Sequence, residues 1–131
     1  MYIFTLVDDV QKIIERLRAE HGDFTLAMLY NSGPLQAGSS WNLIVSALWT
    51  DRMGVAEATR MIVYALSDGL DLQDKGAISR VTVLPTSDLF VKDMTELYPN
   101  TRPAARTTVP QVSGGQVTEG SGFIMYSQKA A

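Results

Sequence analysis

The sequence predicts one α/β domain, of the α+β type, in which helices pack against a mixed sheet of three to four strands. Apolar residues recur at helical spacing across residues 6–17 and 55–66. The run 24–30 is almost continuously apolar and too short for a typical helix, which favours a strand buried on both faces. The length of 131 residues is typical of one domain. We therefore expect the order α-β-β-α-β-α, followed by a C-terminal edge strand.

The first helix is expected between Thr5, a suitable N-cap, and Gly22, a suitable C-terminal stop. Asp8 and Asp9 suit the positive end of the helix dipole, and His21, the only histidine, suits the negative end. The residues predicted to face the core are Leu6, Val10, Ile13, Ile14 and Leu17.

Two strands are expected next, at residues 24–30 and 41–50, joined by the polar loop 31–40 as an antiparallel hairpin. Alternate residues of the second segment are apolar, so Trp41 and Trp49 would share one face of a regular strand. Core packing is the more common use of such a pair, and an aromatic platform for a ligand or partner is the alternative.

A helix over 55–67, followed by Gly69, leads to a β-branched strand over 78–84. A strand, a helix and a strand in that order imply a crossover with parallel strands, which makes the sheet mixed. A third helix is expected from a cap at Thr86 or Ser87 to residue 97. Its inward residues are predicted to be Leu89, Phe90, Met94 and Leu97.

The composition changes after this helix. We expect a globular core at residues 1–99, a Pro/Gly/Thr-rich linker or long loop at 100–121, and a C-terminal strand or tail at 122–131. The last segment would pair with this sheet or with that of a second subunit, and a chain ending after Asn100 would keep a folded core. Its predicted interface residues are Phe123, Ile124, Met125 and Tyr126.

Charge and composition narrow the function classes. A formal net charge of -3 disfavours nucleic acid as a partner. The chain has no cysteine and one histidine, so no metal site and no cofactor are predicted. The apolar N-terminus is interrupted by acidic residues before a signal core forms, and no segment is long enough to span a membrane, so we expect a cytoplasmic protein.

One segment resembles a known family. Tyr30-Asn31-Ser32, Gly38, and the run from Ser39 to Val45 stand where nucleotidyltransferases have an aromatic residue with Gly-Ser, a later glycine, and Ser-Asp-x-Asp before an aliphatic strand. The resemblance implies a nucleotidyltransferase-like core. In that family the two carboxylates hold magnesium against a nucleotide triphosphate, but Ser40 and Asn42 are neutral here, so transfer activity is not expected. The segment 41–47 also looks like one in small bacterial proteins, a similarity that implies no function.

Two functions follow from the sequence. The first is a non-catalytic interaction or oligomerisation module, contacting itself or another protein through the sheet edge and the C-terminal segment. The alternative is a degenerate nucleotidyltransferase-like domain that binds a nucleotide or phosphate compound. Its predicted ligand-binding residues are Ser32, Gly33, Gly38, Ser39, Ser40 and Asn42. No catalytic residue is predicted, and an active site assembled from distant residues stays open.

Overall fold

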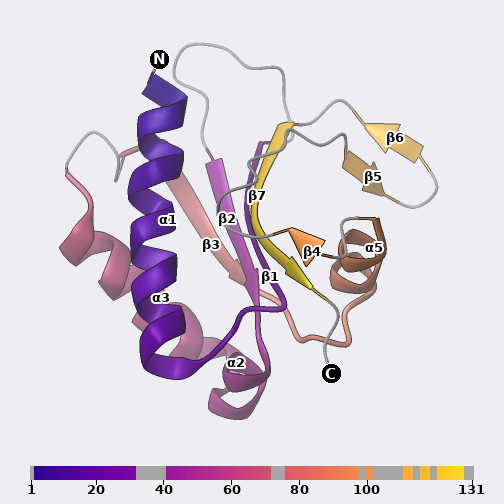
Figure 1. The fold of residues 1–131 in the computed structure, drawn as a ribbon, viewed down its shortest axis with the longest axis horizontal. Helices are drawn as coiled ribbons and strands as arrows, with labels where there is room; N and C mark the ends of the chain where they lie inside the picture. Colours follow the sequence, from indigo (N-terminus) through magenta and orange to yellow (C-terminus); the bar gives the residue numbers. More distant parts are fainter. Residues whose placement is uncertain are drawn as a thin grey trace.

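Helices lie on both faces of a central mixed sheet (Figure 1). The structure, a computed structural model, describes residues 2–31, 41–71, 76–97, 100–101, 111–113, 116–118 and 121–128. The helices are α1 (Tyr2–His21), α2 (Leu48–Met53), α3 (Val55–Gly69) and α5 (Leu89–Leu97). The strands are β1 (Leu26–Asn31), β2 (Trp41–Ser46), β3 (Ile78–Val83), β4 (Asn100–Thr101), β5 (Gln111–Ser113), β6 (Gln116–Thr118) and β7 (Ser121–Gln128).

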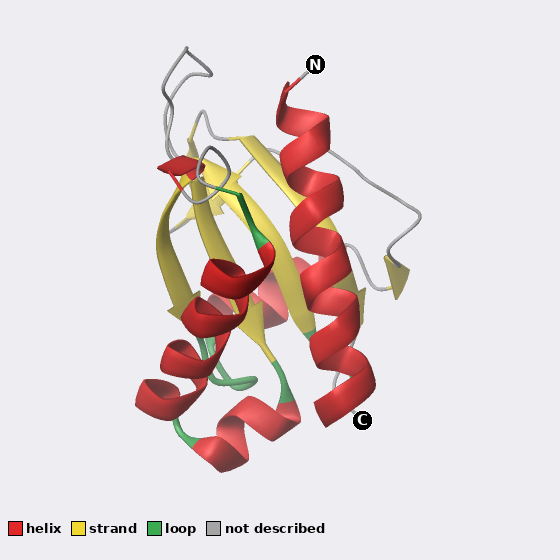
Figure 2. Ribbon diagram, turned by 90° about the vertical axis from the view of Figure 1, so that its left-hand side faces the viewer, coloured by secondary structure: helices red, strands yellow, loops and turns green. Residues whose placement is uncertain are grey.

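The main sheet has the order β3-β2-β1-β7-β4, and β5 pairs with β6 in a separate two-stranded sheet. β1 and β2 are antiparallel neighbours, whereas β2 and β3, which are connected through α3, are parallel. The predicted fold class, a mixed sheet with helices, is therefore confirmed, as are the hairpin and the crossover. Figure 2 shows α1 and α3 side by side over one face of the sheet.

The C-terminal strand β7 belongs to the sheet of its own chain. It pairs with β1 along its length, and the two-residue strand β4 pairs only with its last residues, Ser127 and Gln128. β7 is thus the outermost of the four long strands, but the edge position predicted for it belongs to β4. The side chains of Ile124, Met125 and Ser127 are fully buried. A chain ending after Asn100 would lack these buried residues, so the prediction that it keeps a folded core has to be tested by deletion.

The first helix begins earlier than the sequence suggests, at Tyr2, so Thr5 lies within it and is not its N-cap. The predicted apolar stripe is confirmed, because all five residues are buried. The helix ends where expected. Gly22 follows it with a φ of +123°, and its N–H donates to the carbonyl of Arg18 at 2.9 Å.

The second predicted strand is too long. β2 ends at Ser46, and the segment that follows forms α2. Thr50 stabilises this turn, because its hydroxyl accepts the N–H of Ala47 (3.0 Å) and donates to the carbonyl of Ala47 (2.8 Å). Trp49 therefore does not share a strand face with Trp41, which corrects the predicted aromatic pair. The alternation of apolar residues was misleading because a short half-buried helix also buries a few of its residues.

Trp49 instead connects α2 to the end of α1 through a hydrogen bond and ring contacts. Its indole Nε1 donates to the carbonyl of Gly22 at 3.1 Å. Its ring stacks on His21, with centroids 4.7 Å apart, and meets the edge of Phe24 at 5.5 Å. The side chain of His21 thus has a packing role at this helix end in addition to its position near the dipole.

The third helix ends at Leu97 as predicted, but it begins later than expected. Its cap is Asp88, whose carboxylate accepts the N–H of Phe90 at 2.9 Å, and Thr86 is bonded to Asp51 instead. Leu89 and Leu97 are 75% and 58% exposed, so they do not face inward as predicted. The helix packs on the sheet through Val91, Met94 and Thr95, with Phe90 partly buried.

The sheet separates two groups of buried residues. We call the face under α1 and α3 the covered face, and it includes Leu29, Leu43, Val45 and Met125. The opposite face, the α5 face, has a smaller apolar group formed by Leu26, Met28, Ile44, Val91, Met94 and Ile124. Within the described part of the chain, no helix is long and apolar enough to cross a membrane.

Candidate functional site

The predicted ligand loop lies mostly outside the described residues. This holds for Ser32, Gly33, Gly38, Ser39 and Ser40. Asn42 is described, and it lies one residue after the start of β2, where the chain leaves that loop. Its side chain is half-buried, and its Oδ1 accepts a hydrogen bond from the hydroxyl of Thr82 on β3 at 3.0 Å. The parallel pairing of β2 and β3 brings these two residues together across 40 positions of sequence.

Asn42 forms a row of polar side chains with its neighbours on the α5 face. Its register partners are Tyr30 on β1 and Arg80 on β3, and paired residues of adjacent strands present their side chains to the same face. Thr82, two residues after Arg80, shares that face. We call Tyr30, Asn42, Arg80 and Thr82 the Asn42 row. Arg80 is exposed, and the other three side chains are half-buried.

Two of the predicted interface residues of β7 lie on opposite faces of the sheet. Ile124 packs in the group under α5, and Met125 packs under α1 and α3. Both are fully buried, so neither side chain offers a surface to a partner, and their role is in the core. The side chains of Phe123 and Tyr126 lie outside what the structure describes.

The opposite edge of the sheet is formed by β3, which pairs on one side with β2 and with no other described strand. The N–H of Leu84, just after β3, donates to the carbonyl of Val45 at 2.9 Å. Backbone groups point alternately to the two sides along a strand. The backbone N–H and C=O groups of Arg80 and Thr82 therefore point towards β2, whereas those of Val81 and Val83 point outward.

A groove runs along this edge between β3 and α3. Its volume is about 140 Å³. The residues that line it are Val63, Leu66, Ser67, Leu70, Ile78, Ser79, Arg80 and Val81. Val63 is 45% exposed, and the next residue of α3, Tyr64, is 73% exposed. Apolar surface therefore lies beside backbone groups that have no described partner.

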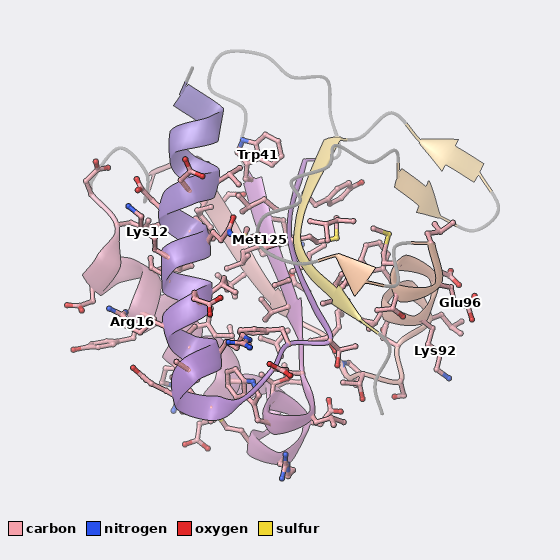
Figure 3. All side chains as sticks on the ribbon, in the orientation of Figure 1. Lys12, Arg16, Trp41, Lys92, Glu96 and Met125 are labelled. Atoms are coloured by element: carbon pink, nitrogen blue, oxygen red, sulfur yellow. The ribbon has the colours of Figure 1, made fainter. Side chains whose placement is uncertain are left out.

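A second hollow, of about 300 Å³, lies between α1 and the C-terminal end of α3. Lys12 and Arg16 project from α1, and Asp9, Ile13 and Gly69 complete the lining (Figure 3). The positive charges are thus accompanied by a carboxylate. Among the described residues, no group of three or more His, Asp or Glu side chains could hold a metal ion.

Sequence reasoning identified Asn42 but missed its neighbours Tyr30, Arg80 and Thr82, and also the edge formed by β3. One sequence signal was available: Arg80 is the only charged residue in any of the described strands. Comparison of the chain with protein-family models, with curated proteins and with solved structures finds no match.

Proposed function

We propose that this protein is an interaction module that self-associates through the β3 edge. The observation that carries this proposal is the outward-directed backbone of Val81 and Val83, which lies beside the groove that Val63 helps to line. Strand addition uses such an edge, since main-chain hydrogen bonds supply affinity and alternate side chains supply specificity. A second copy brings the same edge, so the contact is closed and symmetric.

The pairing register follows from backbone direction and charge. In a symmetric antiparallel pair of two β3 strands, a residue whose backbone groups point outward, such as Val81 or Val83, must pair with a residue of the second copy whose backbone groups also point outward. One permitted register sets Arg80 against Arg80 of the second copy, and like charges directly opposite each other are unfavourable. The register shifted by one step pairs Val81 with its own counterpart and sets Arg80 opposite Thr82. We take this Val81-centred register as the favoured one.

The short regular part of β3 should limit the strength of this association. The pairing of β2 with β3 shifts at Trp41/Asn42, so the regular part of β3 begins at Arg80. Such irregularities shorten the template that an edge strand offers. The exposed side chains of Val63 and Tyr64 on α3 would add apolar contact to these few backbone hydrogen bonds.

Single-cysteine crosslinking tests the register directly, because the chain contains no native cysteine. In the Val81-centred register the two Cα atoms at position 81 lie roughly 5.5 Å apart, which is within the range that a disulfide spans. Val81→Cys should therefore crosslink readily under mild oxidation. Lys92→Cys is the matched control, because that exposed residue lies on α5, at the other face of the sheet.

Sedimentation velocity across a concentration series supplies the second measurement. The native protein should shift from 14.4 kDa towards twice that mass. Val63→Lys should weaken the shift without unfolding the chain, because Val63 is already partly exposed. A mass of one chain at every concentration, or equal crosslinking of the two cysteine variants, would show that the β3 edge is not a self-association surface.

A further inference from the structure

We propose that the Asn42 row is a binding site for a phosphate group. The structure places an arginine, an asparagine, a tyrosine and a threonine together on the α5 face of three adjacent strands. This proposal goes beyond self-association, because Tyr30, Asn42 and Thr82 lie on the α5 face and only Arg80 also lines the groove beside β3.

The chemistry of the row is that of a hydrogen-bond donor set. The hydroxyl of Thr82 donates to Oδ1 of Asn42 and so occupies the acceptor atom of the amide. The amide nitrogen, which can only donate, is the atom left for a ligand. Arg80 adds a guanidinium that cannot accept a hydrogen bond, and Tyr30 adds a phenol hydroxyl. Three donors and one positive charge favour an oxyanion.

The charge around this row supports the same ligand class. Arg80 is the only charged side chain in the described strands, and no described strand contains an aspartate or glutamate. No ion pair joins Arg80 to an acidic side chain among the described residues. The chain is acidic overall, with a formal net charge of -3. The positive charge of Arg80 on this face is therefore a local feature and does not reflect a basic protein.

The lengths of the side chains in the row also suit a small ligand. Adjacent strands lie roughly 4.8 Å apart, so Arg80 and Tyr30 stand about 10 Å apart on either side of Asn42. Both flanking side chains are long and the central one is short. A tetrahedral phosphate over Asn42 could therefore accept from all three residues, and the guanidinium can bind it through two nitrogens.

Lys12 and Arg16 form a pair of basic residues on α1. They share their hollow with the carboxylate of Asp9, which opposes an anion there, whereas the Asn42 row contains no carboxylate. Arg16 is therefore the matched control for Arg80, since both are exposed arginines on regular elements.

The test is a titration of isotope-labelled protein with inorganic phosphate at constant ionic strength, followed by amide and arginine NMR signals. We expect saturable shifts centred on Tyr30, Asn42, Arg80 and Thr82. Arg80→Gln should weaken binding at least about tenfold, since a charge-assisted contact is lost. Asn42→Ala should weaken binding less, and Arg16→Gln should leave it unchanged.

A parallel titration with ethyl phosphate distinguishes the two sources of this group. Tighter binding of the ester assigns the site to a phosphorylated compound, and equal or weaker binding assigns it to free phosphate. Shifts that grow without saturation, or an equal loss of affinity in Arg16→Gln, would overturn the site. Sedimentation of Arg80→Gln, run alongside, keeps this result separate from that of self-association.

Discussion

The two faces of the sheet are built differently. On the covered face, α1 and α3 lie side by side over the strands, and residues from Leu6 on α1 to Met125 on β7 form one continuous apolar group (Figure 2). On the α5 face, a nine-residue helix packs on Met28, Ile44 and Ile124. The same face carries the Asn42 row, in which Tyr30 and Asn42 lie two residues from Met28 and Ile44 on their strands.

This difference separates stability from binding within one sheet. Long amphipathic helices exclude water from the covered face, so its residues contribute chiefly through burial. The short helix α5 leaves accessible polar groups on the opposite face, and such groups contribute little to folding but offer directed hydrogen bonds. The contrast predicts which substitutions should unfold the protein and which should leave it folded.

Removal of β7 should have the largest effect, because this strand serves both faces. Deleting residues 121–131 removes Met125 from the covered face and Ile124 from the α5 face, and it removes one of the two strands that pair with β1. Each buried side chain contributes about 1.5–3 kcal/mol, a large share of the stability of a typical domain, which is about 5–15 kcal/mol. Calorimetry should show no cooperative unfolding transition.

The control for this deletion is a chain that lacks only residues 129–131, which keeps all of β7. It should unfold with the transition of the full chain. A cooperative transition in the longer deletion would mean that α1, α3 and the other three long strands form a core without β7, and the two faces would then not depend on a shared strand.

Leu29→Ala tests the covered face itself. Leu29 on β1 is fully buried, so its truncation should reduce the free energy of unfolding by about 2–5 kcal/mol in urea denaturation. Asn42→Ala, on the adjacent strand but on the α5 face, should cost no more than about 1 kcal/mol, since it loses one half-buried hydrogen bond. Equal losses in the two variants would contradict the proposed division between the faces.

Much of the covered face could be predicted from the sequence, because helical periodicity reports burial locally. The stripe of α1 from Leu6 to Leu17 needed no knowledge of its partners. The boundary at Ser46 could not be predicted in this way. The contact that holds Trp49 in the helical segment is its hydrogen bond to the carbonyl of Gly22, which lies 27 positions away in sequence.

The polar row was harder to predict because it depends on strand pairing. Asn42 emerged from a family resemblance, but its contact with Thr82 and its pairing with Arg80 depend on the register of β2 and β3. That register includes a shift at Trp41/Asn42, and a shift of one residue changes which side chains share a face. A lone arginine in a β-branched segment was visible, but not the groups beside it.

A smaller effect than that of Leu29→Ala is expected at the end of α1. Gly22 has a φ of +123°, where a side chain is strained, so Gly22→Ala should cost about 1–3 kcal/mol in urea denaturation. The added Cβ would lie 3.7 Å from Cδ1 of Trp49, an ordinary contact, so the cost arises from the backbone alone. Gly76→Ala is the control, because an added Cβ meets nothing within 4 Å there, and its stability should change by no more than about 0.5 kcal/mol. If the two variants were equally stable, the turn after α1 would not require this conformation, and Trp49 alone would fix the end of the helix over the covered face.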